Sequence, residues 1–541
     1  MRDRRRFLAG SAGTLSAALF SQWPLETLAQ IGSPATSDWD AGRVRHILPT
    51  VSDSRILIKC SFDRPLSQAP TLQLGSQIVT GVMSDTAGEF WQFYAGDLDA
   101  GRQYTLSLQD SSGSALCEPW PLSTFPDLAA RPERCRVLFY TCAGGPGGSY
   151  EGIGQRQGFL PTEIRNRLLR RALSFEPDAV IANGDQMYWD LHDWRGETAG
   201  ELSANGRESN FDFSTRVFAA NNEASLKAAA GPQIIPVYGN DFRSTPVFFL
   251  QDDHDHWEND AVTDDFASYP IAWFQLQLAR ATQSLYYPEF LPDPRRPMGL
   301  PWSGVGDRGD RSESFGTLRF GNLTEILLFD VRRTMNLAVT NAIFVEGEVE
   351  RWLIDRTRSN ETRHLVHEPS NPFGWSAGKW GEWYPDILDP ETGKLTTAIA
   401  KPYWQQGWLQ QHDRIAAALG SQRDRIAMTI SGDLHAIGAG QILRSGDLEF
   451  ARNPINAILS GPIGTPERAF PSRARGIGST PSVHLDVDET SAPLEQHGFT
   501  LVDFFPDRAV VRQYKWDVNS EPLEALDNLE PFFTTELEPP A

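Results

Sequence analysis

The residues best suited to chemistry in this chain are acids, histidines and one cysteine that directly follow short apolar runs. The run 179–182 leads into Asp185, and the run 247–250 leads into Asp253 and His254. Clustered carboxylates, imidazoles and a thiolate cannot stay ionised away from water without compensating positive charge. Metal cations supply such charge, so these residue types predict a metal centre if the runs end at one place. The residues concerned are Cys142, Asp185, Asp253, His254, Asp330, Asp433 and His435.

Each of these residues taken alone also has a purely structural interpretation. An Asp after a strand often caps the next helix, and a buried His is often a hydrogen-bonded core residue. The acids, however, repeat at the same place on successive runs, which favours one shared site.

Buried strands must position these residues. The runs are apolar at nearly every position, which is typical of strands covered on both faces by helices. They occupy 136–140, 179–182, 247–250, 326–329 and 426–430. Candidate helices lie between them, at 161–175 and 405–419. The pattern predicts an α/β layered fold, in which ligands gather outside the carboxyl ends of the strands.

The rest of the chain divides into segments that differ in their pattern of apolar and polar residues. Residues 40–127 alternate apolar and polar positions between turns, which predicts a small N-terminal β-sandwich. A linker at 126–134 precedes a larger domain at 135–520, whose last part, 499–516, is typical of a β-hairpin. The segments 192–245 and 370–404 are long polar or Trp/Gly/Pro-rich insertions that either shape a cleft or decorate the surface. Residues 521–541 are expected to form a C-terminal tail.

Composition excludes several classes of protein. The 541-residue chain is 40% apolar and 22% charged, as expected of a soluble globular protein, and its formal charge is −21. That charge argues against a nucleic-acid-binding face but not against a phosphate-bearing substrate, because bound cations can reverse the local field. Neither a Gly-Lys-Ser/Thr phosphate loop nor a Gly-x-Ser-x-Gly elbow is found. Four cysteines are too few for a disulfide scaffold, and the pairing of Cys60 with Cys117 stays open.

The N-terminus is typical of an export signal. Arg4, Arg5 and Arg6 form a twin-arginine pattern, and a mildly apolar stretch follows to about residue 20. We therefore expect residues 1–29 to be a signal peptide read by the twin-arginine export machinery, and the protein to be periplasmic or secreted. No later segment approaches the roughly 20 uninterrupted apolar residues of a transmembrane helix.

Four blocks of sequence carry a resemblance to a known family. They are 184–188 (Gly-Asp-Gln-Met-Tyr), 252–255 (Asp-Asp-His-Asp) followed by Asn259, 330–332 (Asp-Val-Arg) and 431–435 (Ser-Gly-Asp-Leu-His). In this order they resemble the PhoD-like alkaline phosphatases, which belong to the calcineurin-like metallophosphatases and are locally similar to purple acid phosphatases. The resemblance covers about residues 135–516. It implies a layered β-sandwich flanked by helices, preceded by a small N-terminal β-sandwich domain.

The resemblance also implies which residues hold metal. Asp185 would bridge two metal positions. Cys142, Tyr188 and His435 would complete a site for ferric iron (Fe3+). Neighbouring calcium (Ca2+) or other divalent ions would be held through oxygen atoms. The implied ligands of these divalent ions are Asp253, Asn259, Asp433 and, as a further candidate, Asp330.

Two further residues acquire catalytic roles from the resemblance. His254 would be the general acid that protonates the leaving oxygen. Arg332 would clamp the phosphate, because its planar fork matches two phosphoryl oxygens. Arg333 is a rival for that role, and a salt bridge is the ordinary alternative for Arg332. Tyr188 and Cys142 retain ordinary alternatives as a packed aromatic ring and a buried thiol.

The chain departs from the family pattern in three places. Its first block is unusually rich in glycine, at 143–148, and the spacing between His254 and Asn259 is a variant. The block usually found before the final histidine is replaced by Val-His-Glu-Pro at 366–369. These departures leave the substrate preference open.

The resemblance predicts a metal-dependent phosphoric ester hydrolase, with small phosphomonoesters, phosphodiesters or both as substrates. The implied mechanism is in-line attack on phosphorus by a metal-bound hydroxide. The alternative is a non-catalytic protein that uses the same metals to bind anionic ligands, and the presence of His254 and Arg332 weighs against it. A structural calcium protein would need neither Cys142 nor Tyr188.

Overall fold

The computed structural model describes residues 39–156, 158–189, 211–257, 269–292, 300 and 311–540, with the backbone alone for 262–263 and 266–267. The signal peptide predicted at 1–29 lies outside these residues. Within the described part of the chain, no helix is both long enough and apolar enough to cross a membrane.

The N-terminal segment is a sandwich of two four-stranded antiparallel sheets, as predicted. The first sheet has the order β1 (Val44–Val51), β2 (Ile56–Phe62), β6 (Phe90–Ala95), β5 (Val82–Met83). The second has the order β4 (Gln77–Thr80), β3 (Thr71–Leu74), β7 (Gln103–Gln109), β8 (Trp120–Ser123). Along β7, alternate residues are buried, as expected when one face of a sheet is solvated.

The larger domain is built on two sheets, and the first has six strands. Its order is β11 (Val247–Leu250), β10 (Ala179–Asn183), β9 (Cys135–Tyr140), β26 (His497–Phe504), β27 (Ala509–Trp516), β28 (Phe533–Leu537). The strands β9, β10 and β11 are parallel, so their carboxyl ends share one edge. All five residues of β10 are buried, which fits their continuous apolar character. The predicted hairpin is formed by β26 and β27.

The second large sheet has eight strands. Its order is β14 (Phe315–Phe320), β15 (Thr324–Phe329), β16 (His364–Pro369), β20 (Met428–Ser431), β23 (Ile455–Ser460), β21 (Ile437–Ser445), β22 (Leu448–Glu449), and β25 (Leu485–Leu494) also pairs with β21. From β15 to β23 the neighbouring strands are parallel. The two sheets meet where Gln513 Nε2 of β27 donates to the Gly438 carbonyl of β21, at 3.0 Å.

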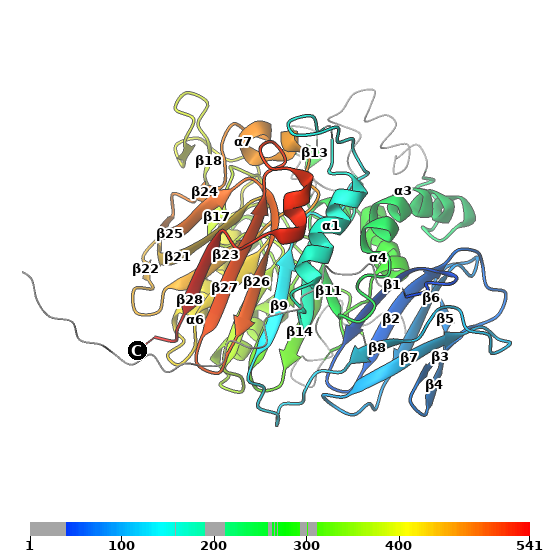
Figure 1. The fold of residues 1–541 in the computed structure, drawn as a ribbon. Helices are drawn as coiled ribbons and strands as arrows, with labels where there is room; N and C mark the ends of the chain where they lie inside the picture. The colour runs from blue at the N-terminus through cyan, green and yellow to red at the C-terminus, as the bar shows by residue number, and fades with distance from the viewer. Residues whose placement is uncertain are drawn as a thin grey trace, which may run out of the picture. The chain divides into compact units, whose positions relative to one another are not determined.

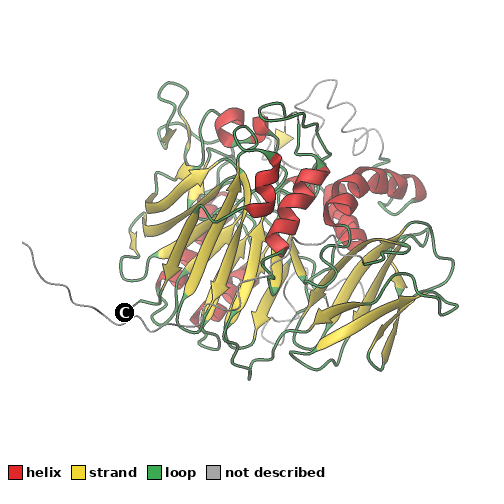
Figure 2. Cartoon of the chain, viewed as in Figure 1, coloured by secondary structure: helices red, strands yellow, loops and turns green. Residues whose placement is uncertain are grey.

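Helices cover the outer faces of these sheets. Apolar residues of α1 (Thr162–Leu173), α3 (Ala220–Tyr238) and α4 (Trp273–Tyr286) share one core cluster with β9, β10 and β11. Residues of α5 (Gly347–Arg358) and α6 (Gln406–Gly420) share a second cluster with β15 and β23. Figure 1 shows α1 lying along β9, and Figure 2 shows the same helices in red against the yellow strands. The predicted layered sandwich flanked by helices is therefore confirmed.

Two segments differ from the sequence analysis. The insertion at 192–245 contains the long helix α3, which has Pro232 and Pro236 in its interior and so gave no helical signal. The expected tail at 521–541 contains a short helix, η5 (Leu523–Asn528), and the edge strand β28 paired with β27. Short elements complete the fold: η2 (His254–His256), β12 (Val262–Thr263), β13 (Phe266–Ala267), η3 (Val339–Asn341), β17 (Trp375–Ser376), β18 (Ile387–Leu388), β19 (Leu395–Thr396), η4 (Glu467–Ala469), α7 (Pro471–Ala474) and β24 (Thr480–Pro481).

Candidate metal centre

The backbone turns sharply at the strand ends that carry the predicted site residues. Cys142 after β9, Asp185 after β10, and Asp433 and His435 after β20 have φ angles of +52°, +60°, +64° and +51°. L-residues seldom adopt such angles, and where they do the conformation is often held at a functional site by its surroundings. These turns bring the side chains from both sheets to one place.

Close backbone approach at this edge requires glycine. A Cβ atom on Gly432 would lie 2.4 Å from Thr141 Oγ1, and one on Gly184 would lie 2.5 Å from the Cβ of Asp252. The end of β20 can therefore approach that of β9, and the end of β10 that of β11, only because Gly precedes Asp433 and Asp185.

One oxygen of Asp185 is the centre of a first group of potential ligands. The Cys142 thiol and the Tyr188 hydroxyl each donate to Asp185 Oδ2 at 3.2 Å. His435 Nε2 lies 4.0 Å from the same oxygen. His435 Nδ1 lies 2.8 Å from the Ala469 carbonyl, which fixes the proton on Nδ1 and leaves the Nε2 lone pair for a metal. Thiolate, phenolate, carboxylate and imidazole donors thus converge from three strand ends.

The electrostatics of this group favour a cation. Burial, together with the Asp185 carboxylate, raises the pKa of the Cys142 thiol and of the Tyr188 hydroxyl well above their usual ranges. Burial also raises the pKa of Asp185 to about 7 and lowers that of His435 to about 3. A positive ion bound among these donors offsets the free-energy cost of burying their anionic forms. Metal ligands therefore bind in the deprotonated state.

The second oxygen of Asp185 provides the test of whether a metal fits. Asp185 Oδ1 is buried and accepts no hydrogen bond from the described residues. Buried polar atoms are almost always satisfied, so an orphan oxygen in such a group is suited to an ion. Asp185, Asp253 and His254 form a second group whose ligand atoms lie within 4.8 Å of one another. Asp185 is therefore shared by two groups of potential ligands.

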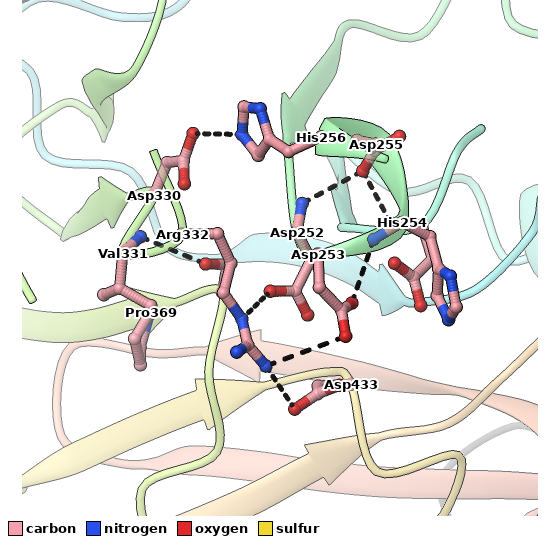
Figure 3. A network of polar contacts seen from close by, with 12 residues as sticks. Asp252, Asp253, His254, Asp255, His256, Asp330, Val331, Arg332, Pro369 and Asp433 are labelled. Carbon is pink, nitrogen blue, oxygen red and sulfur yellow. Dashed lines mark hydrogen bonds and ion pairs between the residues drawn. The ribbon is translucent and has the colours of Figure 1, made fainter. Parts of the chain in front are cut away.

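A third group of carboxylates is occupied by cations of the protein itself. Asp252, Asp253 and Asp433 also have oxygen atoms within 4.8 Å of one another. Arg332 Nε donates to Asp252 at 2.7 Å and its Nη2 donates to Asp433 at 3.1 Å, as Figure 3 shows. The Lys379 ammonium donates to both Asp253 and Asp433. Burial alone would raise the pKa of Asp253, but Lys379, followed by His254 and Arg332, lowers it well below its usual range.

Lys379 and Asp252 are the residues that sequence reasoning missed. Asp252 adjoins Asp253 within a block already singled out, so its position was signalled. Lys379 lies in the insertion at 370–404, among Gly and Trp residues, and nothing in its spacing distinguishes it from any other lysine.

One predicted ligand, Asp330, stands apart from these groups. Asp330 accepts hydrogen bonds from the backbone and Nε of Arg333, and lies 3.3 Å from His256 Nε2. It is therefore not brought to the carboxylates that surround Lys379. Asn259 lies outside the described residues. Arg332, rather than Arg333, is the arginine that reaches the site.

Comparison with known proteins gives a fold but no sequence match. No family model matches the chain, and no curated protein matches it in sequence. Among solved structures, PhoD aligns over 94% of this chain and 92% of its own, with a TM-score of 0.59 and 13% identity. The chain has the fold of PhoD. The purple acid phosphatase PPD1 from yellow lupin (Lupinus luteus) seeds aligns over 91% of this chain and 74% of its own, with a TM-score of 0.52 and 10% identity.

Within this PhoD fold, buried polar residues hold the ligand-bearing turns in place. The Asp255 carboxylate accepts hydrogen bonds from the backbone amides of Asp185, Gln186 and Met187, at 2.8, 3.0 and 2.9 Å. It also accepts one from the amide of Asp252, at 3.0 Å. One carboxylate thereby ties the turn after β10 to the turn after β11. Such outer contacts orient metal ligands and tune their affinity.

The glycine-rich loop at 143–148 is anchored in the same way. Arg165 of α1 is buried, and its Nη1 donates to the carbonyls of Ala143, Gly144 and Gly145 at 2.9, 2.8 and 2.8 Å. Gln233 Oε1 of α3 accepts from the Gly145 amide at 2.9 Å and from the Tyr188 amide at 3.0 Å. The loop and Tyr188 are thus fixed by helices on the outer face of the sheet.

Proposed function

We propose that this protein is a metal-dependent phosphoesterase that hydrolyses phosphomonoesters, phosphodiesters or both. The observation that carries the proposal is the Asp185 carboxylate, whose Oδ2 is surrounded by a thiol, a phenol and an imidazole while its Oδ1 is buried without a hydrogen-bond donor. His254, on the turn after the neighbouring strand β11, shares a ligand group with Asp185, and Arg332, after β15 of the other sheet, contacts Asp252 and Asp433. The likeness of fold to PhoD and to a purple acid phosphatase supports the same chemistry.

The metal that we propose for the first group is ferric iron. Cys142, Asp185 and Tyr188 supply three anionic donors when deprotonated, and His435 supplies a neutral one. A trivalent ion balances three such charges. Calcium is the ion that the resemblance implies for Asp253 and Asp433, and those carboxylates already accept hydrogen bonds from Lys379.

When bound, the metal lowers the pKa of water and stabilises charge on the phosphoryl group. Proton transfer and further charge stabilisation are left to residues of the protein. His254 and His435 are buried, with 6% and 8% of their surface exposed. His254 shares a ligand group with Asp185 and Asp253, and we assign to it the protonation of the departing oxygen. Arg332 is held by Asp252 and by Tyr269, whose hydroxyl accepts from Nη1 at 2.9 Å, and its charge stabilises the phosphoryl oxygens.

A His254→Ala variant tests the proposal. Turnover of chromogenic phosphomonoester and phosphodiester substrates is measured beside the metal content of the same samples. We expect the variant to keep its metal and lose about two orders of magnitude or more in turnover, as is usual for a general acid. His256→Ala is the matched control, because His256 contacts Asp330 instead. Metal-loaded wild-type protein that turns over neither ester would instead support a binding protein for anionic ligands.

We further propose that the protein is exported in folded form through the twin-arginine pathway and works in the periplasm or outside the cell. The proposal rests on Arg4, Arg5 and the stretch that follows them. Replacing both arginines with lysine should retain the protein in the cytoplasm, which fractionation of the cells measures. Unchanged export of that variant would rule the pathway out.

A further inference from the structure

Lys379 is held by a turn that leaves its ammonium little freedom. The buried Glu382 carboxylate accepts from the backbone amides of Ala377 and Lys379, at 2.8 and 3.0 Å, and from the Ser376 hydroxyl. Trp375 and Trp380 on this segment are buried in the core that also contains α6. The side chain of Lys379 is 6% exposed. Its position is therefore built into the fold and is unlike that of a surface lysine that happens to fall near an acid.

The Lys379 ammonium contacts the oxygens that a second metal ion would need. It donates to Asp253 and to Asp433, one carboxylate from each of the two large sheets. Arg332 contacts Asp252 and Asp433 from the other side. Two protein cations thus face three carboxylates, and a divalent ion added at Asp253 and Asp433 would lie against the ammonium. Like charges at such separation repel strongly where water is excluded.

The Asp185 side of the site is different. Among the described residues, no lysine or arginine donates a hydrogen bond to the Asp185 side chain, whose Oδ2 accepts from the neutral Cys142 and Tyr188 donors. Its Oδ1 is left without a donor. Direct contacts from protein cations are therefore made to Asp253 and Asp433 but not to Asp185, so the group around Asp185 is the one suited to an ion from outside.

We propose that the Lys379 ammonium takes the place of a metal ion at the Asp253–Asp433 carboxylate pair, so that this centre holds a single metal ion, at Cys142, Asp185, Tyr188 and His435. The inference rests on the metal-binding part of the proposed function and not on the reaction itself. It makes Lys379 a positioning residue, which sets the number of ions that the site accepts.

Metal stoichiometry tests the inference directly. The full-length protein is purified as it is produced, its tightly bound metal is counted by elemental analysis, and binding of added Ca2+ is measured by equilibrium dialysis. We expect one metal ion per chain in the wild type and no further Ca2+ at the site. In Lys379→Gln and Lys379→Ala, we expect one additional Ca2+ per chain, bound at least ten-fold more tightly than by the wild type.

Lys401→Gln is the matched control. Lys401 belongs to the same insertion, is equally buried, and pairs with Glu382 at 3.5 Å and with the Tyr384 carbonyl at 3.1 Å. Its loss removes a buried ammonium without opening the Asp253–Asp433 pair, so its metal count should match the wild type. An extra Ca2+ in this control as well would contradict the assignment to Lys379.

The number of metal ions per wild-type chain tests the inference even if the Lys379 variants fail to fold. Two or more metal ions per wild-type chain would overturn the inference, as would folded Lys379 variants that bind no additional Ca2+. Two ions together with ester turnover would overturn the inference and leave the proposed function intact. One ion per chain without turnover of either ester would support the inference and contradict the proposed function.

Discussion

The carboxylate of Asp255 accepts a hydrogen bond from the backbone amide of Asp185, with 2.8 Å between Oδ2 and nitrogen. Asp185 is the residue that two of the ligand groups share. Its φ of +60° is a conformation that the chain does not adopt without support. Asp255 supplies that support, so the metal centre depends on a residue that does not itself belong to any of the ligand groups.

Replacing Asp255 with Asn should weaken the metal centre without removing a ligand. Asn has one acceptor oxygen, whereas both oxygens of Asp255 accept from backbone amides. We expect metal affinity to fall by roughly 10- to 100-fold, the usual effect of losing an outer contact. Competition with a chelator measures this affinity. Asp178→Asn is the control. The Asp178 carboxylate accepts a hydrogen bond from the Arg136 amide at 2.7 Å, just before β10 begins and so at the end of that strand away from Asp185. Equal losses in the two variants would show that the effect is not local to the site.

Arg332 and Arg333 should separate into a functional and a structural arginine. Arg332 faces Asp252 and Asp433, whereas Arg333 pairs with Asp330 and with Glu313, the latter at 2.9 Å. A lysine cannot reproduce the planar fork of arginine. We therefore expect Arg332→Lys to lower kcat/KM for phosphate esters by about ten-fold or more, with metal retained.

Arg333→Lys should instead lower the free energy of unfolding, by about 1–3 kcal/mol, because it weakens a buried charge network. Its kcat/KM should stay within a few-fold of the wild type. Denaturant unfolding and steady-state kinetics on both variants measure the two quantities. The reverse pattern would assign the phosphate clamp to Arg333.

Cys142→Ser and Tyr188→Phe should each remove one anionic donor from the first ligand group. Phenolate and thiolate bound to ferric iron absorb visible light by charge transfer. We expect a visible band in the iron-loaded wild type that shifts or disappears in Tyr188→Phe, and a lower iron content in Cys142→Ser. Absorption spectra and elemental analysis of the purified proteins provide the measurements. A colourless wild type with full metal content would argue for a divalent ion in this group.

His46 should make the fold sensitive to acid. It is buried where β1 packs against α4, with Nδ1 2.6 Å from Ser61 Oγ and Nε2 2.9 Å from the Tyr286 carbonyl. Burial lowers the pKa of His46 to about 4. Between pH 6.5 and 4 the unfolded chain therefore takes up a proton that the folded protein does not, so stability falls as pH falls.

The loss attributable to His46 over that interval is roughly 3 kcal/mol, at about 1.4 kcal/mol per pKa unit. Other buried groups contribute to the total slope, so the comparison must be with a His46→Gln variant. Its unfolding free energy should depend less steeply on pH over this range. Parallel pH profiles of the two proteins would show that His46 does not contribute.

Sequence predicted the parts of this structure that depend on local patterns. The strands that carry Cys142, Asp185 and Asp433 are continuous apolar runs, and such runs identify buried strands without knowledge of their partners. Parallel order then places the ends of β9 and β10 at one edge, whereas Asp433 joins them from the other sheet, where Gly432 packs closely against Thr141. The helix α3 was missed because Pro232 and Pro236 contradict the local rules, and packing against the sheet overrides them.

The contacts of Lys379 could not be predicted in this way. Lys379 and Asp253 are 126 residues apart, and their contact depends on how the segment around Trp375 and Trp380 is anchored in the core. A side chain brought in by an insertion leaves no periodic signal. The same holds for Asp330, whose place after β15 suggested a ligand, although its neighbours Arg333 and His256 satisfy its carboxylate.

The most direct test of the central claim is the hydrolysis of paired chromogenic phosphomonoester and phosphodiester substrates. The protein is assayed as purified, after removal of its metal with a chelator, and after iron is restored. We predict turnover of at least one ester that is lost when the metal is removed and recovered when it is restored. Turnover that is unaffected by metal removal, or none from protein shown to carry its metal, would contradict it.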